Sequence, residues 1–374
     1  MDGSYWQKGD LPGGYEKHLI TGLNDSYEYA GDDILLGDYR PESTLKLKRT
    51  ILTRHKFPAI NIHCHLAGVK PGDILGGINE MDSTNTEAII NLDGGLIFSC
   101  AEKAINAFDK KYPGRFYTFI IVNSSGIDEP DFAENIRGRV KKSAEYGAKG
   151  IKLFKETGLA EKDTRGETVL PDDERLRPVW DAAAEFNLPV LYHIADPFAF
   201  FLPYGNTNER FENLRLHPDW HFYKPCYPGF ENLMECMRNL LYKNPRTNFI
   251  IPHLGSLSED LERLSGMLDD FKNMHVDFAA RIDQLARVPY TARKFLIKYA
   301  DRVLYGTDGG NIGGNTVYAR VLETDDEYFN PRDGTDSQKE RSRIMGYGLF
   351  LPDDCLKKIY RENAARLLGL NANK

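Results

Sequence analysis

The sequence predicts an α/β protein built as a (β/α)8 TIM barrel. Eight short apolar runs, rich in β-branched and aromatic residues, alternate with longer segments whose apolar residues recur three and four positions apart. The span from the first run to the eighth, residues 59–308, matches the roughly 250 residues that such a barrel requires. A doubly wound open sheet would need a glycine-rich phosphate loop, and the sequence contains neither GxGxxG nor GxxxxGK[ST].

Each apolar run is predicted to form one strand, and the segments between the runs are predicted to form helices. The expected strands are 59–66, 87–95, 115–123, 149–155, 189–195, 248–254, 274–280 and 302–308. Residues 1–57 are rich in Gly, Tyr, Asp and Pro and follow neither period. We therefore expect an irregular N-terminal arm, packed on a barrel domain at 58–374 that ends in helices.

Composition limits the classes of partner and compartment. The 374 residues carry 48 Lys and Arg against 55 Asp and Glu, a net charge of −7, and no basic stripe, so no nucleic-acid partner is expected. No run approaches the ~18 apolar residues of a membrane span. The five cysteines are scattered without CxxC spacing, and the first residues do not resemble a signal peptide. These features predict a cytoplasmic protein without a nucleic-acid or membrane partner.

Histidines and one aspartate fall where the predicted strands end. His63 and His65 are two residues apart in a strand, so their side chains point to the same face. An HxH pair alone is weak evidence, because hydrogen-bonded structural histidines produce it too. However, His193, His253 and Asp308 each close another strand, at the barrel end that carries active sites. Imidazole and carboxylate suit Zn²⁺ and related ions, and this predicts a divalent metal held by His63, His65, His193 and Asp308.

This set of residues resembles the metal-dependent amidohydrolase superfamily, which carries HxH after strand one, His after strands five and six, and Asp after strand eight. The contexts NIHCHLAG, LYHIADP, IPHLGS and LYGTDGG, with the closing segment ENAARLLGL, are similar to the branch that includes aminocarboxymuconate-semialdehyde decarboxylase. The resemblance covers about residues 57–370. It implies one metal ion on the four predicted ligands, with His253 beside the water or substrate.

His253 and Asp308 are the candidate catalytic residues. A metal lowers the pKa of bound water to about 7, and an imidazole that titrates around 6.5 can exchange protons with it. His253 is thus a candidate general base or acid, with a buried structural role as the alternative. Asp308 could either bind the metal or accept a proton from the water.

The number of metal ions depends on Lys152. In binuclear relatives a carboxylated lysine late in strand four bridges two metals, and Lys152 is the better positional match in this sequence. His193 and His253 would then belong to the second ion. The branch named above usually holds one ion, so we expect one, Zn first and Mn or Fe as alternatives. A free Lys152 could instead anchor a substrate carboxylate or form an internal salt bridge.

Weaker predictions concern substrate binding. Arg281 directly follows the seventh predicted strand, where its guanidinium could clamp a carboxylate through two hydrogen bonds. Pairing with Asp277 or Asp283 is an equally good interpretation.

The stretch at 196–230 is a long insertion after the fifth strand that carries many aromatic residues, Trp220 among them, and Arg210. Long ordered loops of this kind are typical of active-site lids, so Trp220 and Arg210 are candidate substrate contacts. The same aromatic residues could instead pin the loop to the barrel or meet a second copy of the chain, which leaves a homodimer open.

Together these features predict a metal-dependent hydrolase, in which a metal-activated water attacks an ester, lactone or amide bond of a small polar substrate. The alternative is a metal-dependent decarboxylase, a non-hydrolytic lyase, acting on an unsaturated or aromatic carboxylic acid that Arg281 anchors. A binding protein with a structural metal is a third interpretation. A closed structural site, however, needs neither the additional His253 at the rim nor a lid.

Overall fold

The computed structural model describes residues 43–95, 101–310, 312–313, 316–332 and 344–370. Residues 47–374 form one compact unit, which contains every described helix and strand. Most of the predicted N-terminal arm falls outside the described residues. Its described part, residues 43–57, contains neither helix nor strand.

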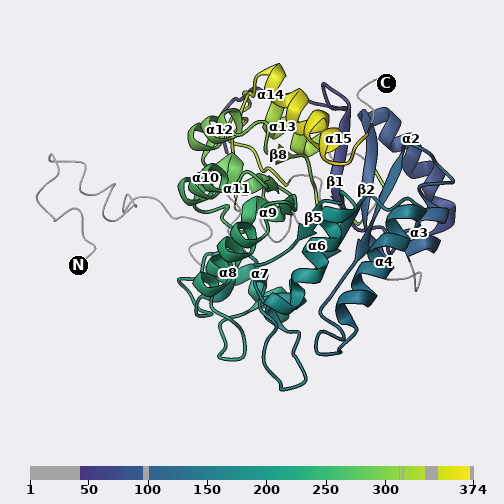
Figure 1. Cartoon of the computed structure of the whole chain (residues 1–374). Helices are drawn as coiled ribbons and strands as arrows, with labels where there is room; N and C mark the ends of the chain where they lie inside the picture. The colour runs from purple at the N-terminus through teal and green to yellow at the C-terminus, as the bar shows by residue number, and fades with distance from the viewer. Residues whose placement is uncertain (1–42, 96–100, 311, 314–315, 333–343, 371–374) are drawn as a thin grey trace, which may run out of the picture. The chain divides into compact units, whose positions relative to one another are not determined.

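Eight parallel strands form one sheet in which neighbours in sequence are neighbours in space (Figure 1). The strands are β1 (Ala59–Cys64), β2 (Thr86–Gly94), β3 (Phe116–Ile121), β4 (Gly150–Leu153), β5 (Val190–Tyr192), β6 (Phe249–Ile251), β7 (Met274–Asp277) and β8 (Val303–Leu304). Each overlaps one of the eight predicted runs. The predicted (β/α)8 fold is therefore confirmed.

Helices surround the strands, as Figure 1 shows. The longer ones are α2 (Ile74–Thr84), α3 (Ala101–Ala107), α4 (Phe132–Tyr146), α6 (Arg177–Glu185), α8 (Phe230–Lys243), α10 (Leu261–Asp270), α12 (Pro289–Lys298) and α13 (Thr316–Glu323). The shorter ones are η1 (Pro71–Asp73), α5 (Glu156–Leu159), η2 (Glu174–Leu176), η3 (Phe198–Phe201), α7 (Phe211–Leu216), η4 (Pro218–Trp220), α9 (Pro252–Gly255) and α11 (Ile282–Arg287), then α14 (Asp353–Lys357), the π-helical η6 (Lys358–Glu362) and α15 (Asn363–Leu367). Among the described helices, none has the length and apolar character needed to cross a bilayer.

Strand side chains alternate between the helical layer and the barrel interior. Tyr192 of β5 points outward and stacks on Trp180 of α6, with 5.9 Å between the ring centres. Its neighbour Leu191 points inward and packs with Ile250 of β6 and Leu304 of β8. Because both faces are buried, the strands are apolar almost throughout, as expected for a parallel sheet under helices.

Backbone hydrogen bonds close the barrel between β1 and the segment that follows β8. The N–H of Ile62 donates to the carbonyl of Tyr305 at 2.9 Å, and the N–H of His65 donates to that of Gly309 at 2.8 Å. In return, the N–H of Asp308 donates to the carbonyl of His63 at 2.9 Å. The predicted HxH motif and the predicted aspartate are thus direct neighbours across the closing seam.

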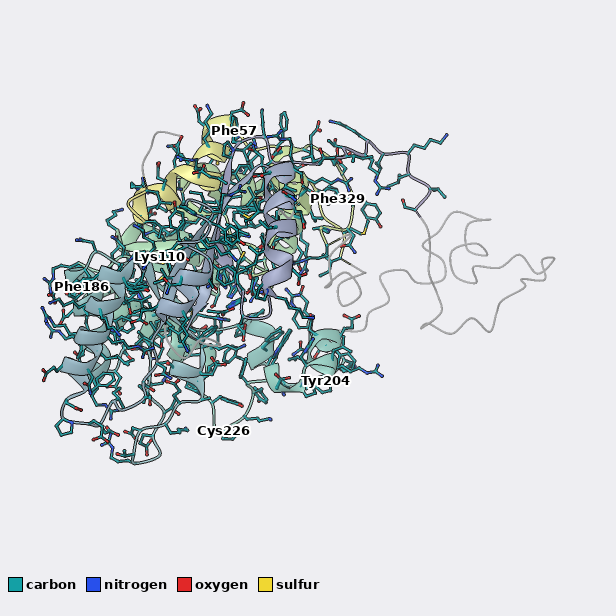
Figure 2. All side chains as sticks on the ribbon, turned by 90° about the vertical axis from the view of Figure 1, so that its right-hand side faces the viewer. Phe57, Lys110, Phe186, Tyr204, Cys226 and Phe329 are labelled. Carbon is teal, nitrogen blue, oxygen red and sulfur yellow. The ribbon has the colours of Figure 1, made fainter. Side chains whose placement is uncertain are left out.

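The insertion at 196–230 projects from the carboxyl end of the strands. Phe57, which precedes β1, and Tyr204 and Cys226, which belong to the insertion, lie at opposite ends of this unit in Figure 2. The insertion contains η3, α7 and η4 and leads into α8. It therefore lies at the same end of the barrel as the residues that close the strands.

Gly150, the first residue of β4, gives a test of packing inside the barrel. A Cβ at this position would lie 2.4 Å from Cζ of Phe119, a fully buried ring. We expect Gly150→Ala to lower the free energy of unfolding by about 1–3 kcal/mol, the usual cost of overpacking, in urea denaturation. Gly138→Ala on the exposed face of α4, where no atom lies within 4 Å, should instead leave stability equal or up to ~1 kcal/mol higher. Equal stability of the two variants would contradict this packing.

Candidate metal centre and active site

Three of the predicted ligands form a compact group. The Nε2 atoms of His63 and His65 each lie 3.3 Å from Oδ1 of Asp308. The two imidazole ring centres are 5.5 Å apart. One ligand atom from each residue lies within 4.8 Å of the others, a spacing that one metal ion can bridge. The closing seam described above produces this proximity, because the backbone bonds join the same residues.

Two further carboxylates orient these imidazoles. Nδ1 of His63 lies 2.8 Å from Oδ2 of Asp277, and Nδ1 of His65 lies 2.8 Å from Oδ1 of Asp93. A carboxylate that accepts from Nδ1 fixes the tautomer and leaves the Nε2 lone pair free for a metal. Asp93 was not predicted, and Asp277 was considered only as a partner for Arg281. Both lie at the carboxyl ends of β2 and β7, so the rule that found the histidines could have found them.

Asp277 also holds the turn that carries His253. Its Oδ1 accepts the N–H of His253 at 2.9 Å and the N–H of Ala279 at 3.0 Å. His253 and Leu254 both have left-handed backbone conformations, with φ of 59° and 58°. Such conformations cost on the order of 1–3 kcal/mol each and persist only where surrounding contacts enforce them. The bond from Asp277 is one such contact, and it places the His253 ring 5.1 Å from that of His63.

His253 is held as a neutral imidazole. Its Nδ1 lies 2.8 Å from the carbonyl oxygen of Ala279, which can only accept, so Nδ1 carries the proton and Nε2 does not. Burial, with the nearby His193 and Arg281, holds the pKa of His253 well below its ordinary value. An unprotonated Nε2 beside His63 can accept a proton.

His193 lies next to His253 but does not belong to the compact group of His63, His65 and Asp308. Its ring centre is 4.4 Å from that of His253, and its Nε2 is 3.4 Å from Oδ1 of Asp196. This buried Nε2 makes no hydrogen bond among the described residues. Burial lowers the pKa of His193 to about 4, against the opposite effect of Asp196, so the imidazole is neutral at pH 7. A neutral imidazole with a free nitrogen is compatible with the predicted ligand role.

Lys152 points into the barrel, since it pairs in register with the inward Leu191. It is 1% exposed, and burial lowers the pKa of its amine to about 8, although Asp308 and Asp277 act in the opposite direction. Among the described residues its Nζ forms no ion pair, and lies 4.8 Å from the centre of the Phe154 ring. The internal salt bridge considered for it is therefore not observed.

Arg281 is buried, donates from Nη1 to its neighbouring carbonyl of Ala280 at 3.1 Å, and has Nη2 3.9 Å from Oδ1 of Asp196. Asp277, one alternative partner of Arg281, instead bonds to His63. Asp283, the other, accepts from Arg332 at 2.7 Å.

The two candidates in the insertion differ in environment. Arg210 is buried, with Nη1 3.9 Å from Oδ2 of Asp283. Trp220 stacks on His217, with 3.8 Å between ring centres, and on Phe200 at 5.8 Å. Both ring partners of Trp220 belong to the insertion itself, so these contacts join residues of the insertion to one another.

Protons and metal are expected to compete at His65. Burial lowers the pKa of this imidazole, but hydrogen bonds to Asp308 and Asp93 outweigh burial and raise it to about 9 in the metal-free protein. The pKa of His65 in the folded protein exceeds the ordinary value of 6.5, so proton binding at His65 stabilises the metal-free fold. This stabilisation is complete below pH 6.5 and is lost as the pH rises through 9. The proton must leave before Nε2 binds a metal, so affinity for Zn²⁺ should rise between pH 6.5 and 9.

Calorimetric titration of metal-free protein with Zn²⁺ at pH 7, in two buffers of different ionisation enthalpy, measures the proton release. We expect release in the wild type and in His217→Gln, a histidine of the insertion, and less in His65→Asn. Identical heats in both buffers for the wild type would refute the competition.

Comparison with known proteins identifies the family. Residues 98–370, more than half of the chain, match the family model described as Amidohydrolase. The match includes His193, His253 and Asp308 and begins after His63 and His65. No curated protein sequence matches the chain.

Three solved structures are similar to the chain at low sequence identity. A protein assigned as an amidohydrolase from Staphylococcus aureus is 16% identical, with a TM-score of 0.52, and the alignment covers 84% of this chain and 100% of that chain. A 2,6-dihydroxybenzoate decarboxylase from Rhizobium is 18% identical, with a TM-score of 0.49 and coverage of 84% and 99%. The 4-oxalomesaconate hydratase from Rhodopseudomonas palustris is 16% identical, with a TM-score of 0.47 and coverage of 83% and 95%. By its family match and its barrel, the chain belongs to the amidohydrolase family and is a metal-dependent enzyme of that kind.

Proposed function

We propose that this enzyme is a hydrolase that directs water to an ester, lactone or amide carbonyl of a small polar substrate. The observation that carries the proposal is the state of His253. Its Nδ1 proton is committed to the carbonyl of Ala279, and its unprotonated Nε2 belongs to a ring 5.1 Å from that of His63. A base of this kind beside a set of metal ligands is what activation of water requires.

The residues present fit a divalent ion. Asp93 and Asp277 hold Nδ1 of His65 and His63, so both Nε2 atoms face the Asp308 carboxylate and can bind an ion once Nε2 of His65 has lost its proton. We propose that His63, His65 and Asp308 hold one ion together with His193, and that Zn is the first candidate and Mn or Fe the alternatives. When bound, such an ion lowers the pKa of water and polarises a carbonyl oxygen.

The chain's own residues then move the protons. His253 accepts the proton of the attacking water at Nε2, and the imidazolium that results keeps its Nδ1 bond to Ala279. The same imidazolium can donate that proton to the leaving alkoxide or amine. Asp277 contributes by fixing the backbone of His253 and the ring of His63 at once. Burial raises the pKa of Asp308, but His63 and His65 outweigh it, hold that pKa well below its usual range and keep the carboxylate charged.

A decarboxylase is the second candidate, and Arg281 favours it. This buried guanidinium is close enough to His253 to lower its pKa, and its Nη2 lies 3.9 Å from Oδ1 of Asp196. Its Nε makes no hydrogen bond among the described residues. A cation in this position could hold the carboxylate of an unsaturated or aromatic acid. His253, as imidazolium, would then supply the proton that replaces the lost CO2.

Metal analysis of the purified protein tests the ligand set. We expect about one divalent ion per chain in the wild type, and strong loss of the ion in His63→Ala and in Asp308→Ala, because each removes a ligand from the group. His217→Gln serves as the matched control and should keep the ion. Two ions per chain would favour carboxylated Lys152 with a second metal. Unchanged metal content in both ligand variants would refute the site.

Isotope labelling separates the two reactions. A panel of esters, lactones, amides and aromatic acids is incubated with the enzyme in ¹⁸O-water. Label in the organic product indicates hydrolysis. Release of CO2 together with an organic product that carries no label indicates a lyase.

His253→Asn should lower kcat by at least ~100-fold, because general acid–base catalysis contributes about 10²–10⁴-fold. Asparagine is chosen because it tolerates the left-handed backbone at this position. The metal content of the variant is measured in parallel. Full turnover by a metal-loaded His253→Asn would exclude His253 as the base.

A further inference from the structure

Buried cationic side chains gather beside the histidine cluster, at the carboxyl ends of β5 and β7. Arg281 follows β7 and is 4% exposed, while Arg210 comes from the insertion and is 3% exposed. Arg281 lies close enough to His253, Asp196 and Arg210 to influence the pKa of each. The two guanidinium groups therefore form one electrostatic neighbourhood with the candidate active site.

The hydrogen-bonding capacity of these groups is largely unused. All three side-chain nitrogens of Arg210, Nε of Arg281 and the amide nitrogen of Gln284 are buried without a hydrogen-bond partner among the described residues. The carboxylate of Asp283 is 3.9 Å from Arg210, beyond hydrogen-bond distance, and its other oxygen already accepts from Arg332. A guanidinium does not give up its proton, so a buried one without acceptors is costly to the fold.

Nearby acids do not balance these cations. Asp196 is 2.5 Å from Nζ of Lys155 and Asp283 is 2.7 Å from Arg332, so each carboxylate already has a cationic partner. Two glutamates also act on Arg210: Glu209, which pairs with Arg287, and Glu259, which accepts from Ser258. Among the described residues, Arg210 and Arg281 thus lack an anion within hydrogen-bond distance.

The turn that delivers Arg210 is braced. Nδ2 of Asn208 donates to the carbonyl of Ala199 at 2.8 Å, and Oδ1 of Asn208 accepts the N–H of Arg210 at 2.8 Å. The backbone of Arg210 is therefore held in place before any ligand binds. Such preorganisation lowers the entropic cost of recognition.

We propose that Arg210 and Arg281 bind an anionic group of the substrate, a carboxylate or a phosphate. The planar guanidinium presents paired N–H donors that match either group, and Gln284 offers a further donor. This inference rests on the proposed function in that the anion belongs to the molecule whose reaction takes place at the histidines. It assigns the substrate to small acids or phosphorylated molecules, and it assigns the insertion the role of supplying one of the two cations.

Binding of succinate and of inorganic phosphate to the purified full chain tests this site. Thermal unfolding and calorimetric titration are run at constant ionic strength, on protein as isolated and again after EDTA treatment, which separates binding by arginine from binding by metal. We expect saturable stabilisation by at least one anion under both conditions. Succinate alone indicates a carboxylate substrate and phosphate alone a phosphorylated one.

Variants locate the binding. Arg210→Gln and Arg281→Gln should weaken the affinity at least tenfold, and Arg215→Gln should leave it unchanged, because Arg215 is an exposed arginine of the adjacent α7. Without anion, Arg210→Gln should be at least as stable as the wild type, since a buried charge is removed. Arg210→Lys keeps the charge but loses the paired N–H donors, and it should also bind anions more weakly than the wild type. This variant serves as the test if Arg210→Gln does not fold.

The proposal is overturned if neither anion binds saturably, or if Arg210→Gln or Arg210→Lys binds anions like the wild type. It is also overturned if Arg210→Gln is less stable than the wild type without anion, because Arg210 would then have a structural role. These outcomes are independent of hydrolysis. Anion binding with no hydrolytic or lyase activity would refute the proposed function and leave the anion site standing, whereas activity without anion binding would do the reverse.

Discussion

The closing seam of the barrel is the constraint on which the site depends. The backbone of His63 accepts from Asp308, and the backbone of His65 donates to Gly309. The side chains of His63, His65 and Asp308 meet because their own backbones are bonded to each other. The backbone contacts that close the barrel are therefore the same contacts that bring the candidate metal ligands together, since the first and last strands, far apart in sequence, become neighbours at this seam.

A layer of carboxylates gives the site its chemical character. Asp93 and Asp277 accept the hydrogen bonds of Nδ1 of His65 and His63, whereas the backbone carbonyl of Ala279 accepts that of Nδ1 of His253. A carboxylate partner favours a basic, metal-binding imidazole, and a neutral carbonyl partner in a buried place favours an imidazole that stays unprotonated. The hydrogen-bond acceptor of Nδ1 thus distinguishes the proposed metal ligands His63 and His65 from the proposed base His253.

Backbone strain accompanies this arrangement. His253, Ala280 and Asp308 all adopt left-handed conformations at the rim, with φ of 59°, 55° and 62°. Hydrogen bonds to Asp277, to Tyr318 and across the seam hold these three positions. The rim is therefore held by hydrogen bonds on the barrel side, while the cations Arg210 and Arg281 bring charge to it from the insertion and from the β7–α11 turn. A hydrogen-bonded ligand set beside buried cations is a setting in which one substrate orientation can be selected.

The sequence by itself determined the eight strands, their order and the face that His63 and His65 share, because strand periodicity and element order are local properties. It predicted His193, His253 and Asp308 as strand ends, and they follow the strands by one to four residues, after Tyr192 of β5, Ile251 of β6 and Leu304 of β8. It did not reveal that Asp93 and Asp277 would orient the histidines, that His193 would lie beside His253 rather than within the closest group, or that Arg210 would be buried without a hydrogen-bond partner among the described residues. Only the tertiary structure decided these points. Periodicity gives the direction of a side chain but not its distance from a residue two hundred positions away, and the course of a long insertion depends on packing against the whole barrel.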